Sequence, residues 1–194
     1  YSRIKFYEMV KNKPGDIVEC GVFKGSGLLT RLKILEMNEP NSIRKVIGFD
    51  FFDNSFVDNL NGIDKITMNE VFSRCDTSSE IGLDFIKAKI IDSCFKQDRF
   101  ELVKGDIIKT SKDYILNKPG FRISILYLDL DLEDPTYETL NNLWDRVVPG
   151  GIIVFDEYSY HNWSESNAVD KFIKEKKIKL HITKIKAPTA FIKK

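Results

Sequence analysis

Short apolar runs alternate along the chain with longer segments in which apolar residues recur at helical spacing. The runs are strand-sized and are bounded by glycine, proline or charged residues, which is typical of β-strands. We predict strands at residues 16–21, 45–50, 100–104, 122–129 and 151–156. The last two are almost wholly apolar, as expected of strands buried on both faces.

The intervening segments predict helices at residues 26–37 and 164–176, and a further helix that runs to about Val147. Asp134 is the expected N-cap of that helix, with Pro135 at its first position, and a Pro-Gly-Gly turn at 149–151 ends it. Residues 179–184 and 189–192 indicate a closing pair of strands. The alternation predicts an α/β, Rossmann-like, doubly wound and mainly parallel sheet in one domain spanning 1–194.

One stretch, residues 54–97 between the second and third strands, is longer than a single crossover needs. It predicts two helices, 63–74 and 81–95, joined by a polar turn. Helices inserted near strand ends often form lids over a site. A packing helix followed by a loop fits the segment equally well, so both interpretations stay open.

Composition narrows the class of protein. The 194 residues are 42% hydrophobic and 30% charged, which is typical of a globular protein, and the net charge of +1 gives no reason to expect a nucleic-acid partner. The longest apolar stretches are strand-sized, so we expect no membrane association. Cys20, Cys75 and Cys94 match no metal-binding spacing, and reduced thiols favour a cytoplasmic location. The first residue is Tyr1 rather than Met, which is compatible with a trimmed N-terminus.

The first strand leads into a glycine-rich turn and then a helix, in the order Glu19-Cys-Gly21-Val-Phe-Lys-Gly25-Ser26-Gly27. Glycines there let a ligand approach the backbone closely. The amides of Ser26 and Gly27 at the helix N-terminus are suited to a carboxylate or phosphate. The spacing differs from the dinucleotide fingerprint, and by itself it is also typical of an ordinary α/β turn.

Two further polar positions follow strands. Asp50, adjoining Phe51, ends the second strand, where an acid can accept hydrogen bonds from ribose hydroxyls. Gly105 and Asp106 follow the third strand, where the carboxylate is placed to accept from an adenine amino group. Strand-end aspartates and Gly-Asp dipeptides are also ordinary turn features.

Acidic residues end the fourth and fifth strands. Asp129 and Asp131 point to the same side if the chain stays extended, and Asp156 and Glu157 follow the next strand. Adjacent strands lie about 4.8 Å apart, so Asp129, Asp156 and Glu157 can converge. Crowded carboxylates repel without a counter-charge, which Mg²⁺ or another divalent cation would supply. The alternative is a set of separate helix-capping acids.

Together these segments resemble class I S-adenosylmethionine-dependent methyltransferases and, within them, the macrocin O-methyltransferase family, which modifies sugars on natural products. The likeness spans about residues 14–160. It is carried by residues 18–27, 48–52, 127–131, 137–139, 148–151 and 155–158.

The resemblance implies seven strands with the last antiparallel, S-adenosylmethionine as cofactor, and a homodimer. It implies that Glu19 and Gly21 line the methionine end, Asp50 holds the ribose, and Asp106 or its neighbours contact adenine. It also implies Mg²⁺ on Asp129, Asp156 and Glu157, although the family usually carries two aspartates where this chain has Asp156-Glu157. The family's N-terminal helical lid is missing, shortened or trimmed here.

The expected reaction is methyl transfer to a hydroxyl oxygen of a small-molecule acceptor, either a sugar or a natural-product glycoside. Asp129 is the first candidate for proton acceptor, Asp131 the second and His161 the third, and the alternative for His161 is a surface loop histidine. A stacking wall for a ring substrate, or the packing of a loop, would explain Tyr158, Tyr160 and Trp163 equally well.

Three other readings compete. A nicotinamide-dependent oxidoreductase lacks its glycine fingerprint here, and a catalytically silent binding module would not need the acids at both strand ends. A metal-dependent enzyme of another chemistry, such as a hydroxylase-like relative, is the strongest rival. A redox iron site usually adds histidines, and the chain has only His161 and His181.

Overall fold

The computed structural model describes residues 2–93 and 95–194 and contains a seven-stranded sheet of order β3-β2-β1-β4-β5-β7-β6. The first five strands are parallel, and β7 runs antiparallel to both β5 and β6. This confirms the predicted mainly parallel, Rossmann-like sheet with an antiparallel last strand. The strands are β1 (Asp16–Cys20), β2 (Val46–Asp50), β3 (Phe100–Lys104), β4 (Ile123–Leu128), β5 (Val147–Phe155), β6 (Leu180–Ile182) and β7 (Ala190–Lys193).

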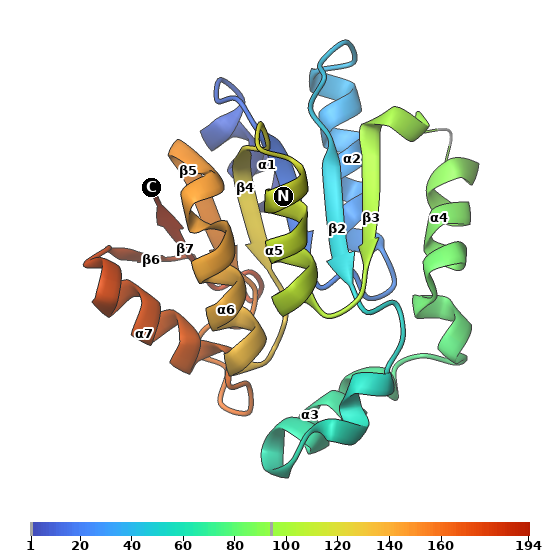
Figure 1. The fold of residues 1–194 in the computed structure, drawn as a ribbon, viewed down its shortest axis with the longest axis vertical. Coiled ribbons are helices and arrows are strands. Elements are labelled where there is room, and N and C mark those ends of the chain that lie inside the picture. The colour runs from blue at the N-terminus through green and yellow to red at the C-terminus, as the bar shows by residue number, and fades with distance from the viewer. Residues whose placement is uncertain (1, 94) are drawn as a thin grey trace.

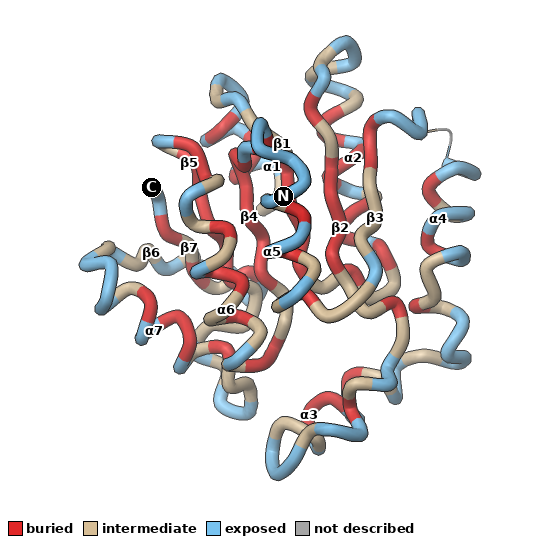
Figure 2. The backbone as a smooth tube through the Cα atoms, in the orientation of Figure 1, coloured by how far each residue is buried: buried red, intermediate tan, exposed pale blue. Residues whose placement is uncertain are grey.

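Helices cover both faces of this sheet (Figure 1). One buried apolar cluster joins the strands to α1 (Ser2–Val10), α2 (Ser26–Asn38) and α4 (Leu83–Asp92). The other joins them to α5 (Ile107–Asn117), α6 (Glu133–Leu143) and α7 (Glu165–Lys176). Because it is covered on both sides, β4 is buried along its whole length (Figure 2).

The sequence analysis did not identify α1 and α5. In α5 the buried residues Ile107, Ser111 and Tyr114 recur at helical spacing, so its one-sided pattern was a usable signal. In α1 apolar residues lie on both buried and exposed faces, and burial of Phe6 and Val10 distinguishes its packed side. Tertiary contact with the sheet therefore decides the packed side of α1.

The predicted start of α6 was wrong. The helix begins at Glu133, so Asp134 and Pro135 lie inside its first turn, and Asp134 is not the N-cap. The hydroxyl oxygen of Ser164, distant in sequence, accepts from the backbone N–H of Glu133 at 2.9 Å. The following strand also begins earlier than predicted, because β5 already includes Pro149 to Gly151.

The 54–97 segment divides into two parts. The helix α3 (Gly62–Phe72) lies beyond the carboxyl ends of the strands (Figure 1), where Met68 packs with Val57 and Leu132 in a small cluster of its own. By contrast, α4 buries Ile86 and Ile90 in a sheet core and acts as a packing helix. The packing interpretation therefore describes α4, and a lid role for α3 stays a prediction.

Two expectations concern the chain as a whole. None of the described helices combines the length and apolarity that a membrane crossing requires. Cys20 and Cys75 are free thiols, and Cys94 lies outside the described residues.

Candidate functional site

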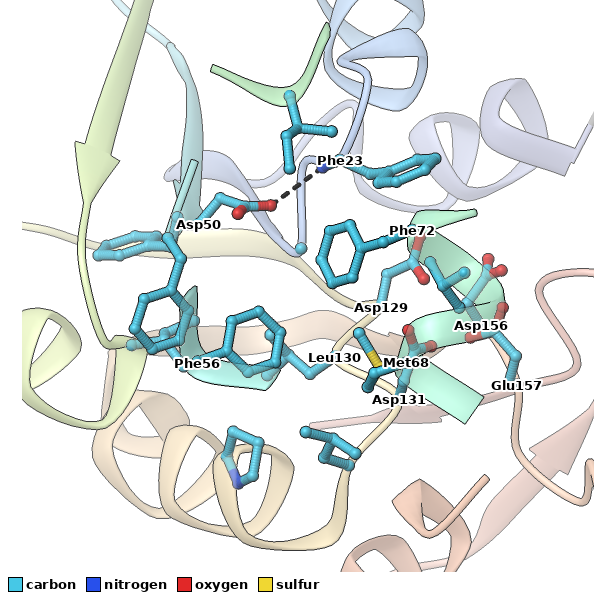
Figure 3. A pocket seen from close by; sticks show the side chains of 18 of the residues that line it. Phe23, Asp50, Phe56, Met68, Phe72, Asp129, Leu130, Asp131, Asp156 and Glu157 are labelled. Carbon is cyan, nitrogen blue, oxygen red and sulfur yellow. Dashed lines mark hydrogen bonds between the residues drawn. The ribbon is translucent and has the colours of Figure 1, made fainter. Parts of the chain in front are cut away.

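A cavity of about 260 Å³ opens at the carboxyl ends of β1, β2, β4 and β5, beside α3 (Figure 3). Ligands bind at this end of doubly wound sheets. The predicted site residues that line it are Gly21, Asp50, Phe51, Gly105, Asp129, Asp131, Asp156 and Glu157. The predicted site residues outside its wall are Glu19, Gly25, Ser26, Gly27, Asp106 and His161.

Asp50 is held by backbone amides on both of its carboxylate oxygens. Its Oδ2 accepts from the N–H groups of Val22 and Phe23 at 2.6 and 2.9 Å, and its Oδ1 accepts from Phe52 at 2.8 Å. Burial raises the pKa of Asp50, while these amides favour the charged form. The aspartate therefore fixes the glycine-rich turn against β2 while it faces the cavity (Figure 3).

Gly21 is required by the close approach of two strand ends. Its φ is 90°, and a Cβ atom there would lie 1.8 Å from the backbone oxygen of Asp129. A side chain would force the ends of β1 and β4 apart. The glycine thus brings the turn next to the acidic residues after β4.

Glu19 is buried behind the cavity wall and does not line the cavity. The side chain is 2% exposed, and its Oε1 accepts from Arg31 at 2.7 Å, while a Cβ at Gly27 would lie 2.0 Å from the same oxygen. The Arg31 guanidinium lies 3.9 Å from the ring centroid of Tyr127, whose hydroxyl donates to Asp156. A buried chain of contacts therefore connects the glycine-rich turn to an acid of the cavity.

The acids after β4 and β5 converge as predicted. One carboxylate oxygen each from Asp129, Asp156 and Glu157 lies within 4.8 Å of the others. Figure 3 shows these side chains with Asp131 on one side of the cavity, opposite Asp50. The cation itself stays a prediction.

Asp131 reaches this group through a turn rather than an extended strand. The strand β4 ends at Leu128, and Asp131 has φ of 67°, a conformation that aspartate adopts more readily than most residues. The expected extended run from Asp129 to Asp131 was therefore wrong, although both residues line the cavity.

Burial and mutual repulsion govern the protonation of this cluster. Burial raises the pKa of Asp129 well above its ordinary value, and Asp156 and Asp131 add to the effect. Burial likewise raises the pKa of Asp131 to about 7, and it raises the pKa of Glu157 by a larger amount. Oδ1 of Asp131 and Oε2 of Glu157 are buried and have no hydrogen-bond partner within residues 2–93 and 95–194. Hard oxygen donors that lack a counter-charge fit a divalent cation such as Mg²⁺.

A further carboxyl beside this cluster, Glu165, was missed. It is 0% exposed, and burial followed by repulsion from Asp131 and Asp156 raises its pKa. In sequence it is an ordinary acidic residue in the first turn of a helix, which the helix dipole favours. No local signal distinguishes it.

Aromatic side chains from the inserted segment form much of the opposite wall. The rings of Phe51 and Phe56 stack with centroids 4.7 Å apart, and Phe56 meets Phe72 edge-on at 5.9 Å. Met68 lies beside them in the cavity wall (Figure 3). Sequence reasoning missed Phe56, Met68 and Phe72 because apolar residues at helical spacing are also typical of core.

The predicted stacking wall after β5 is only partly present. Trp163 lines the cavity. The Tyr158 hydroxyl donates to Asp170 at 2.8 Å, and the Tyr160 hydroxyl donates to the backbone oxygen of Lys186 at 2.6 Å. These two tyrosines therefore hold the loop in place.

Two predicted contacts have no support from the cavity geometry. Oδ1 of Asp106 accepts from Ile108 N–H at 3.0 Å and caps α5, while the preceding Gly105 lines the cavity. His161 is exposed, because the turn after β5 carries it into solvent. Their roles toward adenine and in proton transfer stay predictions, as do those of Gly25 and Ser26 at the start of α2.

The sequence model of the Macrocin-O-methyltransferase (TylF) family matches residues 6–194. The chain belongs to this family. It is 27% identical over 150 residues to a demethyldecarbamoylnovobiocin O-methyltransferase of Streptomyces niveus, covering 76% of this chain and 54% of the relative. It is 24% identical over 148 residues to the Streptomyces olivaceus 8-demethyl-8-(2,3-dimethoxy-alpha-L-rhamnosyl)-tetracenomycin-C 4'-O-methyltransferase, covering 75% and 54%. The chain thus spans about half the length of these relatives.

Solved structures of methyltransferases share the fold. A TDP-rhamnose 3'-O-methyltransferase of calicheamicin biosynthesis superposes with a TM-score of 0.72 at 25% identity, covering 99% of this chain and 76% of that one. The O-methyltransferase NovP superposes with a TM-score of 0.81 at 20% identity, covering 100% and 78%.

Proposed function

We propose that the protein is an S-adenosylmethionine-dependent O-methyltransferase that acts on a hydroxyl of a sugar or natural-product glycoside, assisted by a divalent cation. The observation that carries this proposal is one cavity in which the Asp50 turn faces the converging acids Asp129, Asp156 and Glu157. Membership of the macrocin O-methyltransferase family supports it. The named substrates of the relatives, a rhamnosyl-tetracenomycin and a novobiocin precursor, support the acceptor class.

The cofactor would lie along the turn after β1. Asp50 keeps acceptor capacity for ribose hydroxyls, and Gly105 with the Phe51 ring offers a flat surface for adenine. Gly21 lines the cavity and packs closely against the backbone of Asp129, which would place the methionine end near the acids.

When bound, S-adenosylmethionine supplies an electrophilic methyl group, and a divalent cation lowers the pKa of an acceptor hydroxyl. Asp129, Asp156 and Glu157 would hold the cation. Asp131 lines the same cavity with a pKa raised to about 7 by burial, which suits it to accept the hydroxyl proton. This geometry favours Asp131 for proton transfer and leaves Asp129 chiefly as a ligand.

The apolar wall would orient the acceptor. Phe56, Met68, Phe72 and Trp163 could pack against a sugar ring or an attached aromatic group while the hydroxyl reaches the acids. Since residues 54–72 supply three of these residues, two of them from α3, we propose that this segment acts as a lid in a single methyltransferase domain. The cytoplasmic location, the homodimer and the absence of a nucleic-acid partner stay predictions.

The metal-dependent alternative of another chemistry is less well supported. No histidine belongs to the cavity wall formed by the described residues, whereas redox iron sites commonly use imidazole ligands.

The first experiment is calorimetric titration with S-adenosylmethionine and S-adenosylhomocysteine, followed by methyl-transfer assays on a panel of glycosides with Mg²⁺ or with chelator. We expect micromolar cofactor binding in both conditions and turnover only with the cation. Folded protein that binds neither compound would contradict the proposal. Binding with chelator-resistant turnover would remove only the cation.

A further inference from the structure

Glu165 is a fully buried glutamate that lies next to the acidic cluster. Both carboxylate oxygens of Glu165 are shielded from solvent and form no ion pair within the described ranges, 2–93 and 95–194, and the backbone N–H groups of Glu157 and Asp131 offset only part of the effect of burial. A buried ionised carboxylate without a partner is strongly destabilised. This side chain therefore requires either a proton or a nearby positive charge.

The backbone places Glu165 next to the cluster. Its N–H donates to the backbone oxygen of Asp131 at 3.2 Å, and it begins α7 directly after the loop that follows β5. It is neither part of the cavity wall nor one of the three converging ligands. Glu165 would therefore affect a bound ion without touching it.

We infer that Glu165 is a positioning and charge-supplying residue of the cation site, whose carboxylate tightens the binding of a divalent cation by Asp129, Asp156 and Glu157. This inference rests on the proposed function. A carboxylate charge close to the site, even without direct coordination, attracts a cation strongly where burial lowers the effective dielectric constant. A bound dication in turn supplies the positive charge that the buried carboxylate otherwise lacks.

A purely structural role makes the opposite prediction for stability. If the charge of Glu165 were needed to hold the backbone N–H groups of Glu157 and Asp131, its loss would destabilise the protein. Burial disfavours that charge more strongly than these groups favour it, so Glu165→Gln should leave the melting temperature of the cation-free protein unchanged or raise it. The same variant should bind the cation more weakly.

The test is calorimetric titration of Mn²⁺ into cation-free wild type, Glu165→Gln and Glu165→Asp, with melting curves for each. The matched control is Glu175→Gln, an exposed position on the same helix. We expect Glu165→Gln to bind Mn²⁺ about tenfold more weakly, a usual cost of losing a residue behind metal ligands. Glu165→Asp, which keeps the charge, and the control should stay near wild type.

Equal affinity of wild type and Glu165→Gln would overturn the inference while leaving the cation site in place. An equal loss in Glu165→Asp and Glu165→Gln would also overturn it, because packing rather than charge would then be responsible. If wild type binds no Mn²⁺, the cation part of the proposed function fails instead.

Discussion

The two sides of the cavity differ in what stabilises the charge of their carboxylates. On one side, Asp50 accepts three backbone N–H groups, so its charge is stabilised even without a ligand. On the other, Asp131 and Glu157 keep buried oxygens with no partner among the described residues. The chain itself therefore stabilises the charge of Asp50, whereas the acids on the other side need protons or a cation.

This contrast predicts opposite effects on stability. Removing the Asp50 carboxylate leaves backbone donors unsatisfied, which costs free energy of folding. Removing an acid from the cluster relieves repulsion and should stabilise the cation-free protein. Four predictions test or sharpen the difference.

The largest effect is expected for Asp129→Ala. Because it removes a proposed cation ligand, turnover should fall by about 10³-fold or more, while S-adenosylhomocysteine affinity stays near that of wild type. The melting temperature of the cation-free variant should not decrease. Assays and calorimetry beside the exposed control Asp145→Ala check this. Substantial turnover by Asp129→Ala in chelator would refute the cation-assisted mechanism.

The second prediction concerns pH. Burial raises the folded-state pKa of Asp131 to about 7, so between pH 4 and 7 the native state holds a proton that the unfolded state has released. Stability without cation should therefore fall as pH rises across this range, by on the order of 3 kcal/mol. Urea unfolding at several pH values measures it. Saturating Mg²⁺ should flatten the slope, and an unchanged slope would argue against cation binding at these acids.

Asp50→Ala should affect the other side. Loss of charged hydrogen bonds to ribose should weaken S-adenosylhomocysteine binding about 100-fold, and the free amides of the turn should lower the melting temperature. Mn²⁺ affinity should stay unchanged. Calorimetry with both ligands, beside Asp53→Ala in the same loop, separates the two sides. A comparable loss of Mn²⁺ affinity would show that they are not independent.

The smallest effect is expected for Tyr127→Phe, which removes only the hydroxyl that donates to Asp156 and keeps the ring under Arg31. Cation affinity should fall about tenfold, with cofactor binding preserved. The control is Tyr114→Phe in α5, which removes a hydroxyl that donates to Glu101, away from the acidic cluster. If both variants bind Mn²⁺ like wild type, Tyr127 does not position Asp156.

Local sequence patterns were enough to predict the sheet and the acids at its edge. Strands such as β4 are nearly continuous apolar runs, and a parallel sheet brings their carboxyl ends to one edge, so the convergence of Asp129, Asp156 and Glu157 follows from strand order. Asp50 could be placed for the same reason. These conclusions depend only on local periodicity and on the geometry common to parallel sheets.

Long-range contacts determine which polar residues face the cavity and which are buried behind its wall. Glu19 turns toward Arg31, and Glu165, an ordinary first-turn glutamate in sequence, lies buried beside acids more than thirty residues earlier in the chain. The aromatic wall depends on how α3 lies over the strand ends. Each outcome depends on partners far apart in sequence, and local patterns carry no information about which distant residue will satisfy a buried charge.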